Sequence, residues 1–137
     1  MKDDPVRERL QKLGASESVV TGGLDELVKK WEATAQSLSE GYDLDLDSYV
    51  NDLDVRELLE LAIIDLPAES SRYLARIRAA DSVVKRSTKP SKCVWGEIVA
   101  RKEGWTPEDN WWYFVVPKKA GQELLDDLQR SGTDFSL

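Results

Sequence analysis

The residues between 24 and 38 carry the apolar pattern that most constrains how this chain can fold. Apolar side chains recur there at spacings of three and four residues, the period of one face of an α-helix. They are Leu24, Leu27, Val28, Trp31, Ala35 and Leu38. Gly22 and Gly23 precede this stripe and Gly41 follows it, so we predict a helix that ends near Gly41. Trp31 is then expected in the core.

Two further helical patterns predict partners for this helix. Residues 55–66 are apolar over much of the helix circumference, which predicts a central helix. Asp54 is its expected N-cap, with Glu57 at the capping-box position. Pro67 should end it, and the next pattern predicts a helix over residues 68–86.

The C-terminal third changes character. Residues 93–100 and 111–116 are rich in β-branched and aromatic side chains and predict two antiparallel strands, separated by residues 101–110. Residues 87–92 are expected to be a linker, and residues 120–130 a final helix.

Together these elements predict a single domain over residues 1–137. Its class is mainly α (α+β): a helical core of three to four helices, a C-terminal two-stranded antiparallel element and a final helix. A short helix over residues 5–13 and a connection up to residue 23 are expected at the periphery, and residues 133–137 are expected to form a loose tail.

Composition excludes several classes of function. The 137 residues carry a net charge of −7, which argues against generic nucleic-acid binding because phosphate contacts need clustered cations. There is no histidine and one cysteine, so Ser-His and Cys-His nucleophile pairs and CxxC metal sites are ruled out. No apolar run approaches the ~20 residues of a membrane span. The N-terminus lacks the apolar core of a secretion signal, and with the single cysteine this predicts a cytoplasmic protein without a membrane partner.

The charge is unevenly distributed along the chain. Residues 40–69 carry ten acidic and one basic side chain, whereas residues 70–92 carry seven basic and one acidic side chain. If the two blocks pack as antiparallel helices, part of this charge is complementary within the fold. The one acid of the basic block, Asp81, falls close to the apolar face of its helix. It is interpreted either as a carboxylate paired with a nearby Arg or aromatic N–H or O–H, or as an acid in a pocket.

The acidic block contains one spacing that resembles a known metal site, the EF-hand calcium loop. Ligand positions 1, 3, 5, 7, 9 and 12 of such a loop would be filled by Asp43, Asp45, Asp47, Tyr49, Asn51 and Asp54. Position 6 holds Ser48 where the loop needs glycine, and position 12 holds aspartate rather than a bidentate glutamate. The alternative is a segment in which Leu44 and Leu46 alternate with solvated aspartates. We predict no metal and no cofactor.

Six of the eleven aromatic residues lie in twenty positions near the C-terminus. Trp111 and Trp112 are adjacent, so in a strand their side chains would point to opposite faces, one to the core and one outward. An exposed Trp/Tyr surface would be typical of a binding hot spot, while coverage of both faces would make the cluster core.

These features predict a non-catalytic protein-interaction module that binds a protein with a basic surface, in the manner of an immunity protein or antitoxin. The predicted binding residues are Asp43, Asp45, Asp47, Asp52, Trp105, Trp111 and Trp112. The alternative is a small-ligand or metal-dependent enzyme that uses carboxylates. A pocket that holds Asp81 and tryptophans would favour the enzyme, and an exposed aromatic patch would favour the binding module.

Overall fold

The computed structural model describes residues 17–131; the helix predicted over residues 5–13 and the tail over 133–137 lie outside this range. The described elements are α2 (Glu17–Glu40), α3 (Leu46–Asp65), α4 (Pro67–Ser70), η1 (Ser71–Tyr73), α5 (Leu74–Arg86), β1 (Thr88–Pro90), α6 (Glu97–Glu103), η2 (Trp111–Tyr113), β2 (Val115–Pro117) and α7 (Gln122–Ser131). The predicted class, mainly α with a two-stranded antiparallel element and a final helix, is confirmed.

Helix α2 buries the stripe that the sequence predicts. All six stripe residues are at most 6% exposed, and Trp31 and Leu27 are fully buried. Residues 17–22, predicted as a connection, are helical instead. Gly23 interrupts the helix there, with φ 64° and ψ −150°, a backbone conformation that residues with a Cβ rarely adopt. The helix ends before Gly41, as predicted.

Helix α3 begins at Leu46, nine residues before the predicted start. The Asp45 side chain caps it by accepting a hydrogen bond from the Ser48 N–H at 3.0 Å. The prediction of Asp54 as N-cap is therefore wrong, because Asp54 lies within the helix and its carboxylate binds side chains of the C-terminal third. The capping-box role of Glu57 is wrong for the same reason: its carboxylate accepts from Asn110.

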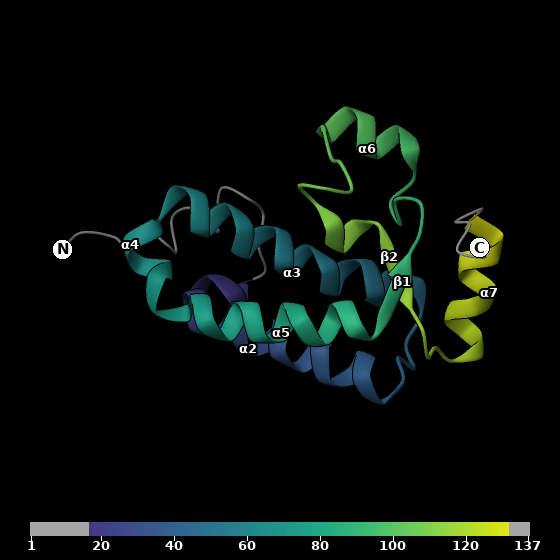
Figure 1. Cartoon of the computed structure of the whole chain (residues 1–137), viewed down its shortest axis with the longest axis horizontal. Coiled ribbons are helices and arrows are strands. Elements are labelled where there is room, and N and C mark those ends of the chain that lie inside the picture. Colours follow the sequence, from purple (N-terminus) through teal and green to yellow (C-terminus); the bar gives the residue numbers. More distant parts are fainter. Residues whose placement is uncertain (1–16, 132–137) are drawn as a thin grey trace.

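The three long helices α2, α3 and α5 run side by side (Figure 1), and α2 packs against both of the others. Pro67 ends α3 as predicted, because α3 stops at Asp65 and Pro67 opens α4. The helix predicted over residues 68–86 is divided into α4, η1 and α5. Its buried residues are Ser70, Tyr73, Ile77, Ala80 and Val84.

The two strands pair antiparallel, but β2 alone overlaps a predicted strand segment, at residues 115–116. Strand β1 lies in the stretch predicted as a linker, and Thr88, Lys89 and Pro90 stand opposite Pro117, Val116 and Val115. Pro90 is compatible with this sheet because a two-stranded sheet has free edges where a missing N–H costs nothing. The pairing continues irregularly, since the N–H groups of Ser91 and Val94 donate to the carbonyls of Phe114 and Tyr113.

Residues 97–103, predicted in part as strand, form helix α6 instead. Gly96 and Gly104, with φ 95° and 74°, bound this helix, and Gly104 ends it in the left-handed conformation typical of a C-terminal cap. Residues 91–110 carry α6 away from the three-helix core (Figure 1). We call residues 91–114 the α6 lobe. The second predicted strand becomes a turn of 3-10 helix, η2, followed by β2. Helix α7 starts two residues after the predicted position, with Leu124 and Leu128 buried.

Candidate functional site

A buried ion pair joins the acidic block, residues 40–69, to the basic block, residues 70–92. In this pair the acidic block supplies the cation and the basic block supplies the acid. Arg56 is the one cation of the acidic block and Asp81 the one acid of the basic block. The Nε and Nη2 groups of Arg56 donate to the two Asp81 oxygens at 2.9 and 3.0 Å, the fork geometry that an arginine makes with a carboxylate. The Trp31 indole N–H donates to the same carboxylate at 2.8 Å. Asp81 is thus the paired carboxylate, one of the two interpretations that its position in the sequence allowed.

Two more side chains complete the surroundings of Arg56. Glu60 accepts from Nη1 at 3.0 Å, and the guanidinium lies 4.6 Å from the centroid of the Trp112 ring. Burial alone would lower the pKa of Arg56, but the hydrogen bonds and charges of Asp81 and Glu60 outweigh it, and this pKa is raised. The network links α2, α3, α5 and η2, so it acts in the fold rather than in a pocket.

Two other acids of α3 are also held by aromatic side chains. The Tyr42 hydroxyl donates to Asp52 at 2.5 Å, and the Tyr113 hydroxyl donates to Asp54 at 2.5 Å. The Trp95 indole N–H reaches the same oxygen of Asp54 at 3.2 Å. Asp54 thereby fastens the α6 lobe to α3.

Burial raises the pKa of the Asp52, Asp54 and Glu57 carboxyls, and their hydrogen bonds offset this only in part. A carboxyl with a raised pKa holds its proton more tightly in the folded chain than in the unfolded chain. The stability that it contributes is therefore complete below its unfolded pKa and is lost as the pH rises through its folded pKa. These three groups should make the protein less stable as the pH increases from acid toward neutrality.

Asp54→Asn tests this sign. Asparagine keeps an oxygen that can accept from Tyr113 and Trp95 but does not ionise. We expect the free energy of unfolding of the variant, relative to the wild type, to increase as the pH rises from about 4.5 to about 7. Urea unfolding at the two pH values measures this. Asp47→Asn, an exposed acid of the same helix, is the control and should show a smaller change. If the stability of Asp54→Asn relative to the wild type falls as the pH rises, the pKa of Asp54 is not raised in the folded chain.

The start of α3 packs against α7, a helix that also carries acidic side chains. Residues 42 and 120 form a parallel bridge, and the Leu46 N–H donates to an oxygen of Asp127 at 3.2 Å. Asp43 lies against Gly121, so closely that a Cβ atom at position 121 would come within 2.5 Å of the Asp43 Oδ1. Asp43, Asp47, Glu123 and Asp126 are exposed. We call these four residues, with Leu44, the acidic end. Leu44 is 52% exposed, whereas Leu46, which alternates with the aspartates in the same way, packs against the core.

The EF-hand interpretation does not fit this geometry. Helix α3 already contains the residues of positions 5 to 12, so they cannot curl around one ion. Tyr49, at position 7, is fully buried and its hydroxyl donates to the Val115 carbonyl at 2.7 Å. Within residues 17–131 no group of three or more acidic or cysteine side chains is arranged to hold a metal ion.

The three predicted tryptophans have different surroundings. Trp112 is 1% exposed and belongs to the core. Trp111 is partly exposed; its ring lies edge-on to Trp112 at 5.8 Å, and the Lys85 ammonium is 4.7 Å from its centroid. Trp105 stacks on Tyr113 at 4.1 Å and lines a cavity. The predicted binding residues are thus not brought together in one site: Asp43, Asp45 and Asp47 lie at the start of α3, Asp52 binds Tyr42, and the tryptophans belong to the C-terminal third.

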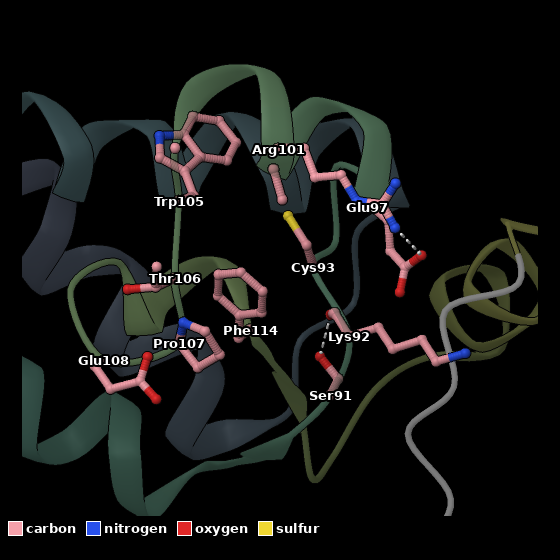
Figure 2. A pocket seen from close by; sticks show the side chains of 12 residues that line it. Ser91, Lys92, Cys93, Glu97, Arg101, Trp105, Thr106, Pro107, Glu108 and Phe114 are labelled. Atoms are coloured by element: carbon pink, nitrogen blue, oxygen red, sulfur yellow. Dashed lines mark hydrogen bonds and ion pairs between the residues drawn. The ribbon is translucent and has the colours of Figure 1, made fainter.

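The cavity lies in the α6 lobe and measures about 530 Å³. Its apolar lining comes from Cys93, Ala100, Trp105, Pro107 and Phe114, and its polar lining includes Ser91, Lys92, Glu97, Arg101, Thr106 and Glu108. Figure 2 shows Trp105 and Phe114 around the Cys93 thiol, with Glu108 on one side and Lys92 and Arg101 on the other. Asp81 does not line this cavity. Burial raises the pKa of the Cys93 thiol, which disfavours the thiolate.

The sequence indicated Trp105 but missed the rest of the cavity, because residues 97–100 were predicted as strand. Gly104 after Arg101 and Lys102 was the available signal, a C-terminal helix cap preceded by cations. The acids of α7 were missed as neighbours of Asp43, since nothing local to either segment indicates the bridge.

Comparison with known protein families, curated proteins and solved structures gave no match. The site therefore has to be interpreted from its own chemistry. Among the helices of the described part of the chain, none has the length and apolar character that crossing a membrane requires.

Proposed function

We propose that this chain is a non-catalytic, cytoplasmic protein-interaction module that binds a partner with a basic surface. The observation that carries the proposal is the division of its acids into two groups. Asp52, Asp54 and Asp81 are bound by side chains of the fold. Asp43 and Asp47 are exposed beside the acids of α7, on either side of an exposed leucine.

The arrangement of the acidic end suits contact with a protein. Leu44 offers apolar area that a partner can bury, and the surrounding carboxylates favour basic side chains at the rim. Arg130 pairs with Asp127, which leaves Asp43, Asp47, Glu123 and Asp126 as the exposed acids of this end, next to the exposed Lys118 and Lys119. A net charge of −7 adds long-range attraction for a basic partner.

The carboxylate enzyme receives less support. The sequence indicated Asp81 as the candidate catalytic acid. Its carboxylate accepts three hydrogen bonds from Arg56 and Trp31. A general acid or base needs access to a substrate proton, and these donors occupy the carboxylate from inside the core.

Charge reversal at the acidic end tests the proposal. The partner would first be isolated by affinity capture from source lysate and identified by mass spectrometry. Asp47→Lys should then weaken binding to the purified partner, mainly through a slower association rate that depends on salt. Glu69→Lys is the matched control, because Glu69 is also an exposed acid in the first turn of a helix, at the opposite end of the molecule from α7 (Figure 1). Equal binding by Asp47→Lys and the wild type would refute the proposed surface.

A further inference from the structure

The cavity of the α6 lobe is not used by the acidic end, and its chemistry is different. Its volume of about 530 Å³ falls within the range of binding pockets, ~300–1,000 Å³, and aromatic side chains line it. Trp105 and Phe114 present ring surfaces to it (Figure 2). This lining suits an apolar or aromatic group, which would lose contact with water on entering.

The charges around the cavity are unequally distributed. Glu108 lies on the side of Pro107, while Lys92 and Arg101 lie on the opposite side together with Glu97 (Figure 2). Neither Lys92 nor Glu108 has a side-chain hydrogen bond or ion pair within residues 17–131. Arg101 meets Glu97 only at 3.7 Å, and both side chains are more than two-thirds exposed, so this pair is weak. A ligand that crosses the cavity thus meets an acid at one end and two cations with one acid, a net positive charge, at the other.

An exposed apolar residue also lies on α6, outside the cavity lining. Ile98 stands three positions before Arg101 and about 100° around the helix from Glu97. It is 82% exposed. A partner that covered α6 would remove this side chain from water, which a small molecule inside the cavity would not do.

We propose that this cavity binds a short peptide segment of the partner, and the proposal rests on the interaction function proposed above. The segment carries an aromatic or large aliphatic anchor that enters between Trp105 and Phe114. A basic side chain on one flank of the anchor faces Glu108. An acidic side chain, or a C-terminal carboxylate, on the other flank faces Lys92 and Arg101.

Peptide titrations followed by ¹H–¹⁵N NMR test this assignment. The probe is acetyl-Lys-Ala-Trp-Ala-Glu-amide, which has no net charge, so a change in the net charge of the protein should affect it little. We expect shifts of the Trp105 indole signal and of the backbone signals of residues 91–108. Replacing the tryptophan of the peptide by alanine should weaken binding about tenfold or more, as loss of an anchor does.

Charge exchange supplies the decisive comparison. Glu108→Lys should lower the affinity for the probe about two- to fivefold. It should raise the affinity for a peptide with glutamate at both ends by a similar factor. Lys92→Glu should also weaken binding of the probe, and it should strengthen binding of a peptide with lysine at both ends. Glu103→Lys and Lys102→Glu are matched controls, because both residues are exposed on α6 and do not line the cavity. Urea midpoints near that of the wild type would show that all four variants fold.

The outcomes separate the two proposals. If no probe shifts the cavity signals at millimolar concentration, or if Glu103→Lys acts as strongly as Glu108→Lys, the cavity assignment is wrong. If in that case Asp47→Lys still weakens binding to the isolated partner, the interaction function stands without the cavity. Peptide binding with the expected charge exchange supports the cavity assignment whatever the effect of Asp47→Lys.

Discussion

Arg56→Ala should lower the free energy of unfolding by about 3–5 kcal/mol, as removal of one partner from a buried ion pair does. The reason is that the Asp81 carboxyl group, whose side chain is 14% exposed, would lose its cationic partner and keep the Trp31 N–H as the remaining donor of the network. The exposed pair of Arg76 and Glu32 is the control, with side chains about 40% exposed. Arg76→Ala should cost about 0–1 kcal/mol.

The double variant Arg56→Met with Asp81→Asn separates pairing from charge. It removes both charges, and asparagine keeps an acceptor for Trp31. Its loss of stability should be smaller than that of Arg56→Ala, because no buried charge is left unpaired. Urea unfolding measures all three variants. A double variant less stable than Arg56→Ala would mean that the ion pair itself, rather than the avoidance of an unpaired charge, stabilises the fold.

Trp112→Ala should cost about 3–5 kcal/mol, the loss expected for truncation of a core aromatic residue. Trp112 is 1% exposed and its ring also contacts the Arg56 guanidinium. Trp112→Phe should retain much of this stability, because the ring face remains and the Trp112 N–H has no hydrogen-bond partner in the described part of the chain. Thermal or urea unfolding gives both values.

Trp111→Ala is the companion to this measurement. Its ring is partly exposed and lies over Lys85 at the surface, so the loss should be clearly smaller than for Trp112→Ala. Because this variant should fold, its affinity for the isolated partner shows whether Trp111 belongs to the interface. If both alanine variants unfold alike, the two tryptophans act only in the core.

Helical periodicity in the sequence correctly predicted the buried face of α2. The stripe from Leu24 to Leu38 has one face, and that face is buried as expected. The start of α3 was misplaced because Asp45 and Asp54 are equally good caps by residue type. Only the tertiary contacts of Asp54 with Tyr113 and Trp95 remove it from that role. Hydrogen bonds between distant residues are not visible in a local pattern.

The strands show a second limit. β-Branched Ile98 and Val99 suggested a strand, yet the positive φ of Gly96 and Gly104 delimits a helix around them. The antiparallel pairing lies earlier in the chain, from Thr88 onward. The candidate site was foreseen only where it is local, at Asp43 and Asp47. The cavity and the contact with α7 arise from tertiary structure.

The attachment of the α6 lobe has an evolutionary consequence. Pro90 stands opposite Val115, and the Ser91 N–H binds the Phe114 carbonyl at 2.8 Å, so the chain leaves the sheet and returns to it at nearly one place. A segment whose ends are fixed so close together can change in length or sequence with little effect on the helices beneath it. Residues 97–104 are therefore the part of this segment that can change most freely, while Trp95, Asn110 and Tyr113 hold the lobe against α3.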